Sequence, residues 1–388
     1  MFHGHVTALS MSVMAALFVS LAACWLAAAA AVRAMRPGVA RFIGVLVLGW
    51  GACTATTAGA AGPAWGAVVG SSLAAAWFVL VPEWAFRAKA GYWSFSVARE
   101  IGAEAHAARV AGVAAAVAAS ASGAPARLCT GDRSAPISMQ ARAYKASCES
   151  IHVSLGEVVS YDARSRVLVV EPRCDVMRIG AFLARRGAAL PVAPETDFLT
   201  IGGLVMGSGI GSSSCVHGLV ADACVAFELV LGDGSTRTVR RGEDAFLGVP
   251  FSHGCACFLV GVHVQCVPAA PYVLLSLTPA HSHEAAMADL LRASRAAADA
   301  AAHSDMHSPA GSAAGTGAPQ FVEAIVFSPA LSVLITGAFV GAPPRGVPLF
   351  ASRWWSPFYH NRVRAMVAAG GATLCMPTTA YLFRCAIG

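Results

Sequence analysis

Residues 190–234 read LPVAPETDFLTIGGLVMGSGIGSSSCVHGLVADACVAFELVLGDG and decide the fold. Their centre, residues 200–214 (TIGGLVMGSGIGSSS), sets glycines among small hydroxyl residues after one apolar run and before another. Glycine permits positive φ and close backbone approach, so successive peptide N–H groups can converge on an anion. The pattern predicts a phosphate-binding loop, and the alternative is a glycine-rich surface loop.

The residues that follow favour the phosphate loop. Residues 227–231 (FELVL) are typical of a strand, and Gly232-Asp233-Gly234 predicts a tight hairpin into the polar run STRTVRR. A glycine loop, a strand, an LGDG turn and another strand are the order seen in FAD domains of the vanillyl-alcohol-oxidase type. More narrowly, this segment resembles the delta(24)-sterol reductase family (diminuto/seladin type), FAD enzymes that reduce a sterol side-chain double bond.

The chain before the glycine loop predicts the rest of an α+β cofactor domain. Residues 151–155, 158–161 and 167–170 indicate short strands, and residues 176–186 carry apolar side chains at helical spacing. Further upstream, RLCTGDRSAP begins at residue 127, and the family has a similar CTG there. The resemblance implies backbone contact with the FAD pyrophosphate in this first loop, and a plain turn is the alternative.

The resemblance also implies which residues bind the cofactor. Covalent relatives attach the flavin through a histidine in the first loop, and none is present here, so noncovalent FAD is expected, with NADPH as the electron donor. The expected contacts are Thr130, Gly131, Thr200, Ile201, Gly202, Gly203, Leu204, Val205, Met206, Gly207, Ser208, Gly209, Ile210, Gly211 and Ser212.

Composition predicts a membrane anchor. The 388 residues are 56% hydrophobic and 12% charged, with a mean hydropathy of +0.62, which is too apolar for an ordinary soluble protein. Apolar runs at about 6–32, 42–62 and 64–81 predict up to three transmembrane helices, and a buried helical pair is the alternative for the last two. Basic residues follow the first and third runs, which places both clusters and the catalytic domain on the cytosolic side. We expect an endoplasmic reticulum membrane protein.

The predicted fold class is α+β, with N-terminal transmembrane helices, a two-subdomain FAD-binding domain and a partial α/β cap domain. The predicted order is a membrane anchor (1–95), an Ala-rich helix and linker (96–126), an FAD-binding domain (127–272) and a partial substrate or cap domain (273–388) with a flexible insert (303–319). Residues 268–278 are expected to close the FAD domain with a final strand, and residues 321–341 to form two cap strands. The family continues further than Gly388, so the chain resembles a C-terminally truncated member.

The implied partners are a sterol and the membrane. An isolated alkene is a poor hydride acceptor, so the enzyme must supply a proton as well as a hydride and hold the sterol in a dry apolar slot. Glu323, Tyr359 and His360 are candidate proton donors, and no catalytic residue is assigned. Glu228, within FELVL, is interpreted as a structural acid, with a flavin-side acid or an outward-facing residue of an edge strand as alternatives.

Charge, cysteine spacing and three departures from the family pattern bear on other classes of site and function. The net charge of +6 includes no dense basic run interleaved with aromatics, which argues against nucleic-acid binding. The 12 cysteines lack paired CxxC spacing, so no metal site is expected. Cys257 stands where the family usually has a glycine, and Cys215 and His217 also replace family residues. The alternatives are another flavin oxidase or dehydrogenase of this fold, and an inactive membrane scaffold.

Overall fold

The computed structural model describes residues 97–120, 126–129, 149–152, 154–196, 199–302, 318–351 and 358–385. The chain divides into two units, Met1–Phe86 and Arg87–Gly388, and all described residues belong to the second. The three expected transmembrane segments, Thr130, Gly131 and most of the insert 303–319 lie outside the described residues. Within the described ranges, no helix combines the length and the apolar character needed to cross a bilayer.

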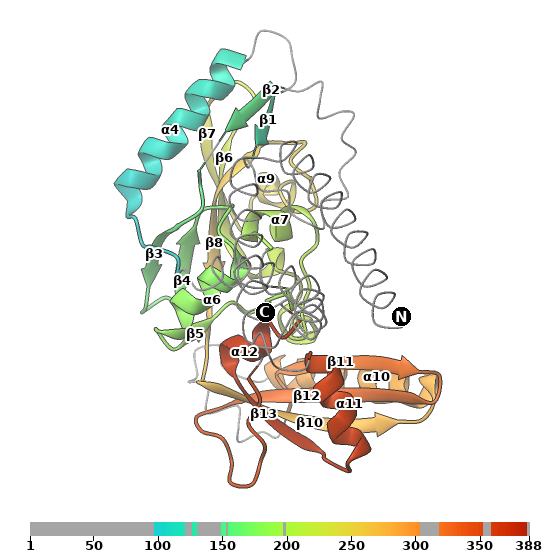
Figure 1. Ribbon diagram of the computed structural model, residues 1–388. Coiled ribbons are helices and arrows are strands. Elements are labelled where there is room, and N and C mark those ends of the chain that lie inside the picture. Colours follow the sequence, from blue (N-terminus) through green and yellow to red (C-terminus); the bar gives the residue numbers. More distant parts are fainter. Residues whose placement is uncertain are drawn as a thin grey trace, which may run out of the picture. The chain divides into compact units, whose positions relative to one another are not determined.

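A five-stranded antiparallel sheet forms the centre of the first half of this unit (Figure 1). In spatial order it consists of β3 (Val158–Asp162), β4 (Val167–Val170), β8 (Phe258–Gln265), β6 (Cys224–Val230) and β7 (Thr236–Arg240). The predicted strands at 158–161, 167–170 and 227–231 are thus confirmed to within a few residues. The predicted hairpin joins β6 to β7, and Gly234 adopts φ +83° in its turn.

Helix α4 (Ala103–Ser120) packs against this sheet (Figure 1). Its buried Val113 and Val117 share a core cluster with Val230 of β6 and Val260 of β8. The Ala-rich helix predicted within residues 96–126 is confirmed as α4, and it packs on the sheet instead of standing apart from it. The Ala-rich composition concealed the role of α4, because a few large side chains at helical spacing suffice to bury one face.

Short elements connect these strands. Strand β1 (Ala126–Cys129) pairs in parallel with β2 (Glu149–His152), so the strand expected at 151–155 lies earlier in the chain. Helix α6 (Val176–Ala184) confirms the predicted helix, and β5 (Ala188–Ala189) pairs with β9 (Val267–Pro268). The others are α7 (Ile201–Met206), α8 (Ser214–His217), a 3-10 turn η1 (Ala221–Ala223) and α9 (Asp244–Leu247).

A second antiparallel sheet has the order β11–β12–β10–β13. Its strands are β10 (Tyr272–Ala280), β11 (Phe321–Ser328), β12 (Leu331–Val340) and β13 (Thr373–Pro377). The two strands expected within residues 321–341 are confirmed. The strand expected to close the FAD domain at 268–278 is instead β10, which pairs with β12 and β13. In chain order, β8 is the last strand of the five-stranded sheet, although it lies at the centre of that sheet.

Helices cover both faces of the second sheet (Figure 1). On β12, Val333 and Ile335 belong to the core cluster that includes Val363 of α11 (Tyr359–Ala368). The alternate residue Leu334 clusters with Ala297 of α10 (His283–Ala302). Successive strand residues point to opposite faces, so α10 and α11 lie on opposite sides. The short helix α12 (Thr378–Leu382) follows β13.

Candidate functional site

The glycine segment, defined as residues 200–214, begins with a helix rather than a loop. Thr200 caps α7, and its hydroxyl oxygen accepts a hydrogen bond from the Gly203 N–H at 3.3 Å. The N–H groups of Ile201 and Gly202 donate to the carbonyl oxygens of Cys174 and Pro172, at 3.1 and 2.8 Å. These first N–H groups are thus engaged within the chain, so the geometry does not favour them as phosphate donors.

Unengaged backbone N–H donors lie at the C-terminal end of α7. Ser208 adopts φ +64°, and the Gly209 N–H donates to the Leu204 carbonyl at 2.8 Å, which is a Schellman-type helix end. Within the described part of the chain, no acceptor pairs with the N–H groups of Ser208 and Ile210. Both residues are exposed, as are Gly203 of α7 and Gly207, which directly follows that helix. A phosphate fits this face, because it combines unengaged N–H donors with little side-chain bulk.

Three glycines of the segment are required for close packing. An added Cβ would lie 2.5 Å from the Pro172 Cβ at Gly202, 2.8 Å from both the Leu204 Cβ and the Val220 Cγ2 at Gly209, and 2.3 Å from the Ala193 carbonyl oxygen at Gly211. The tightest contact, at Gly211, is with a backbone atom that cannot rotate away. The glycine pattern thus reflects close packing of the segment on Pro172, Ala193 and Val220 as much as access for a ligand.

Gly211→Ala is expected to destabilise the protein by roughly 1–3 kcal/mol, the usual cost of forcing a methyl group into a packed site. Thermal unfolding of the purified chain measures this loss. Gly232→Ala is the matched control, because nothing lies within 4 Å of an added Cβ there and no positive φ is recorded. Equal melting temperatures for the two variants would contradict the packing role of Gly211.

A strained turn at residues 249–257 covers the end of α7. The Phe251 and His253 N–H groups donate to the carbonyl oxygens of Val205 and Met206, both at 3.4 Å. Phe251 (φ +61°) and His253 (φ +51°) both adopt left-handed backbone conformations, which are costly for such side chains and cluster at functional sites. Cys257 is half-buried, and burial raises the pKa of its thiol, so this cysteine is not an activated nucleophile.

Two of the three candidate proton donors meet on the second sheet. The Tyr359 hydroxyl donates to the Glu323 carboxylate at 3.1 Å, and Arg384 pairs with the other carboxylate oxygen. Burial, with the nearby Glu323 charge, raises the pKa of Tyr359 well above its ordinary value. Glu323 serves as an acceptor and Tyr359 holds its proton, so neither is assigned as the acid. His360 is exposed and stacks on Phe358 at 5.7 Å between ring centroids. Sequence reasoning missed Arg384, which lies in no recognisable motif.

Glu228 lies inside the five-stranded sheet, because β6 is flanked by β8 and β7, which excludes the edge-strand alternative. Its two carboxylate oxygens are 2.9 Å from His106 Nε2 and 2.7 Å from His263 Nε2. Hydrogen bonds from the two histidines, together with their charge, outweigh burial and lower the pKa of Glu228 to about 2. This pairing supports the interpretation of Glu228 as a structural acid.

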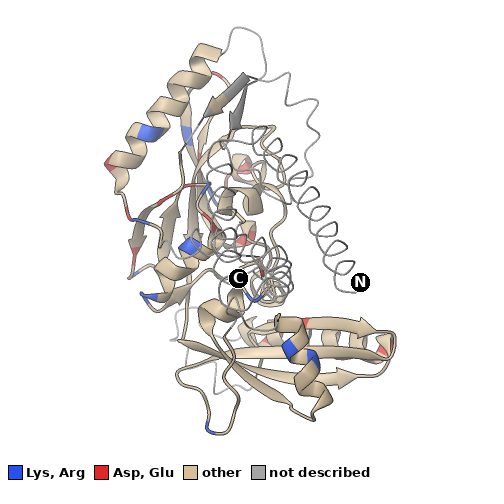
Figure 2. Ribbon diagram, in the orientation of Figure 1, with Lys and Arg blue, Asp and Glu red and all other residues tan. Residues whose placement is uncertain are grey.

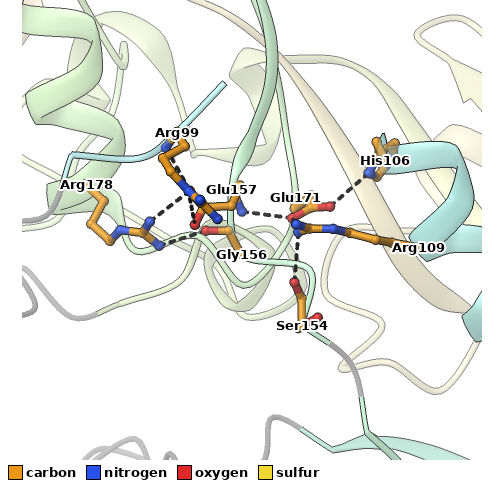
Figure 3. Close-up of polar contacts among 8 residues, drawn as sticks. All are labelled: Arg99, His106, Arg109, Ser154, Gly156, Glu157, Glu171 and Arg178. Carbon is orange, nitrogen blue, oxygen red and sulfur yellow. Dashed lines mark hydrogen bonds and ion pairs between the residues drawn. The ribbon is translucent and has the colours of Figure 1, made fainter. Parts of the chain in front are cut away.

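His106 also contacts the fully buried Glu171, which follows β4, as Figure 3 shows. Its Nδ1 lies 3.1 Å from Glu171, while Arg109 Nη1 and the Glu157 N–H donate to the other Glu171 oxygen at 3.0 and 2.8 Å. Glu104 and Arg109 are the charged residues of α4 (Figure 2). A histidine on an Ala-rich helix was the available signal for this cluster, but its partners are more than 60 residues away.

Comparison with known proteins agrees with this arrangement. Residues 106–240 match the family model of an FAD-binding domain. This part of the chain is similar to an FAD-binding domain. The match begins at His106 in α4 and includes the glycine segment, β6 and β7, which agrees with the packing of α4 on the sheet. The assignment of Thr200 to Ser212 to the cofactor stays a prediction, and the geometry favours Ser208 and Ile210 among these residues.

Curated relatives confirm the family that the sequence resembles. The chain is 31% identical to the delta(24)-sterol reductase of Homo sapiens over 229 residues, which are 58% of this chain and 40% of the relative. It is 38% identical to that of Rattus norvegicus over 151 residues, 38% of this chain and 29% of the relative. The Pisum sativum protein of the same name is 29% identical over 234 residues, 58% and 40% of the two chains. The aligned region thus spans well under half of each relative.

Proposed function

We propose that the chain is a membrane-anchored, FAD-dependent reductase that saturates a sterol side-chain double bond of the delta-24 type, with NADPH as the electron donor. The main support is the match of residues 106–240 to an FAD-binding domain, together with relatives named delta(24)-sterol reductase. The proposal places the enzyme in sterol biosynthesis, at the endoplasmic reticulum membrane, with a cytosolic catalytic domain. The apolar composition of the chain supports a membrane anchor. Since a sterol partitions into the bilayer, an anchor would also bring the enzyme close to its substrate.

The described residues suggest how the chain contributes to this reaction. Noncovalently bound FAD would supply the hydride-transfer chemistry. The N–H groups of Ser208 and Ile210 would bind its phosphates, and α7 gives them a rigid support. Glu323 accepts hydrogen bonds from both Arg384 and Tyr359, so the Tyr359 hydroxyl is directed at this carboxylate. We therefore assign neither residue as the proton donor to the alkene.

The detergent-purified full chain is expected to show a flavin absorbance spectrum that bleaches on anaerobic addition of NADPH. Saturation of a side-chain-unsaturated sterol by the reduced enzyme then tests the substrate. Gly232→Ala should retain the flavin as the wild type does. Gly211→Ala should retain less, because its segment cannot pack on Ala193.

Three outcomes separate the alternatives. Flavin that is reduced by a polar alcohol and reoxidised by O₂, without a response to NADPH, would favour an oxidase of the same fold. No flavin after reconstitution with FAD would refute the enzyme and leave the membrane scaffold. Flavin that bleaches with NADPH, but leaves every unsaturated sterol unchanged, would refute the substrate class.

A further inference from the structure

Arg384 is a buried cation at the junction between the glycine segment and the second sheet. It lies in the turn after α12 and is 2% exposed. Its Nε donates to Glu323 of β11 at 3.1 Å, its Nη1 to the Tyr381 carbonyl at 3.1 Å and its Nη2 to Glu195 at 3.3 Å. A guanidinium is expensive to bury unless it is paired, and here two carboxylates from distant parts of the chain compensate its charge.

Glu195 connects Arg384 to the loop that supports the glycine segment. This supporting loop, residues 191–195, contacts the segment at two points. Gly211 packs directly on the Ala193 carbonyl, and the Ser213 hydroxyl donates to the Pro191 carbonyl at 2.6 Å. The Cys385 N–H donates to the Glu195 carbonyl at 3.2 Å, so the turn that carries Arg384 holds both the backbone and the side chain of Glu195.

A second connection reaches the glycine segment directly. The Tyr381 hydroxyl donates to the Ser212 hydroxyl at 3.2 Å, and the Val322 N–H donates to the Ser212 carbonyl at 2.7 Å. The Arg384 guanidinium lies 4.5 Å from the centroid of the Tyr381 ring, so the same cation fixes this ring. Ser212 is two residues from Ile210, whose N–H is one of the unengaged donors.

We propose that Arg384 is a positioning residue that sets the geometry of residues 208–213 through Glu195 and Tyr381, so that packing of the second sheet controls the affinity of the FAD site. The identity of the ligand, FAD, rests on the proposed function. The effect of Arg384 on the geometry of residues 208–213 does not depend on that function. Among the described residues, Arg384 makes no hydrogen bond to Ser208 or Ile210. It acts by holding the loop and the tyrosine that hold Gly211, Ser212 and Ser213.

Glu195→Ala in the full chain tests the coupling, because Glu195 is partly exposed and its loss leaves the pair of Arg384 with Glu323 in place. Hydrogen exchange of the Gly209 and Gly211 amides, which donate to the Leu204 carbonyl and the Ser214 hydroxyl, should accelerate about tenfold, the size expected for a lost hydrogen bond to a charged group. The FAD dissociation constant should rise by a similar factor, while exchange of β6 and β8 stays unchanged. Glu243→Ala, which removes the exposed pair of Glu243 with Arg237, is the matched control and should change neither quantity.

The double variant Arg384→Met with Glu323→Gln removes the cation and its buried partner charge together, and should show a larger acceleration confined to the same residues. Unchanged exchange at Gly209 and Gly211 in both variants would overturn the inference, as would equal acceleration throughout β6 and β8. A wild-type chain that binds no FAD would refute the proposed function alone, because the exchange measurement still decides the coupling.

Discussion

His106→Ala should lower the free energy of unfolding by ~3 kcal/mol, the lower end of the range for removing one partner of a buried ion pair. His106 is 4% exposed and lies between Glu228 of β6 and Glu171, which directly follows β4. Its loss leaves two carboxylates facing each other across a cavity. The cost stays at the lower end because Arg109 still pairs with Glu171, and His263 with Glu228.

Hydrogen exchange of β6 and β8 amides in the detergent-purified chain measures this loss, since the slowest amides report the free energy of global opening. His281→Ala is the matched control, because His281 is exposed and makes a single 3.4 Å contact with the Ala330 carbonyl. If His106→Ala and His281→Ala give equal protection of β6 and β8, the ion pairs of His106 do not stabilise the sheet.

The free energy of unfolding should fall by ~3 kcal/mol as the pH rises from about 6.5 through about 9. Burial lowers the pKa of His106, but the hydrogen bonds and charges of Glu171 and Glu228 outweigh it and raise the pKa from 6.5 to about 9. A group whose pKa is higher in the folded state stabilises the fold fully below its unfolded pKa and loses that contribution as the pH passes its folded pKa. The charged groups that face His106 are Glu171, Glu228 and, across these carboxylates, Arg109 and His263.

The lowered pKa of Glu228 arises from its ion pair with His106, which also raises the pKa of His106. The two pKa shifts therefore report one contribution to the free energy of unfolding. The lowered pKa of Glu228 predicts a second loss of stability as the pH falls from about 4.5 through about 2. Thermal unfolding across pH 5.5–9.5 follows the alkaline limb. The His106→Ala variant should show a flat profile there, and an alkaline loss of the same size in that variant would assign the dependence to other groups.

The features that depend on local pattern could be predicted from the sequence. Alternating apolar residues and the glycine turn predicted β3, β4, β6 and the β6–β7 hairpin, because side-chain periodicity and turn geometry are set over a few residues. The resemblance carried by residues 190–234 identified the FAD-binding domain for a similar reason, since its glycines and its LGDG turn are contiguous.

Which hydrogen-bond donors and charges remain available could not be predicted from the sequence, because this depends on tertiary contacts. Which N–H groups of the glycine segment are unengaged depends on the carbonyls of Pro172 and Cys174, which lie outside the motif. The assignment of β10 to the second sheet depends on pairing with β12, about 60 residues further along the chain. The pairings of His106 and Arg384 likewise join residues more than 60 positions apart. Such contacts leave no periodicity in one sequence, because their energy comes from burying opposite charges together after the strands have paired.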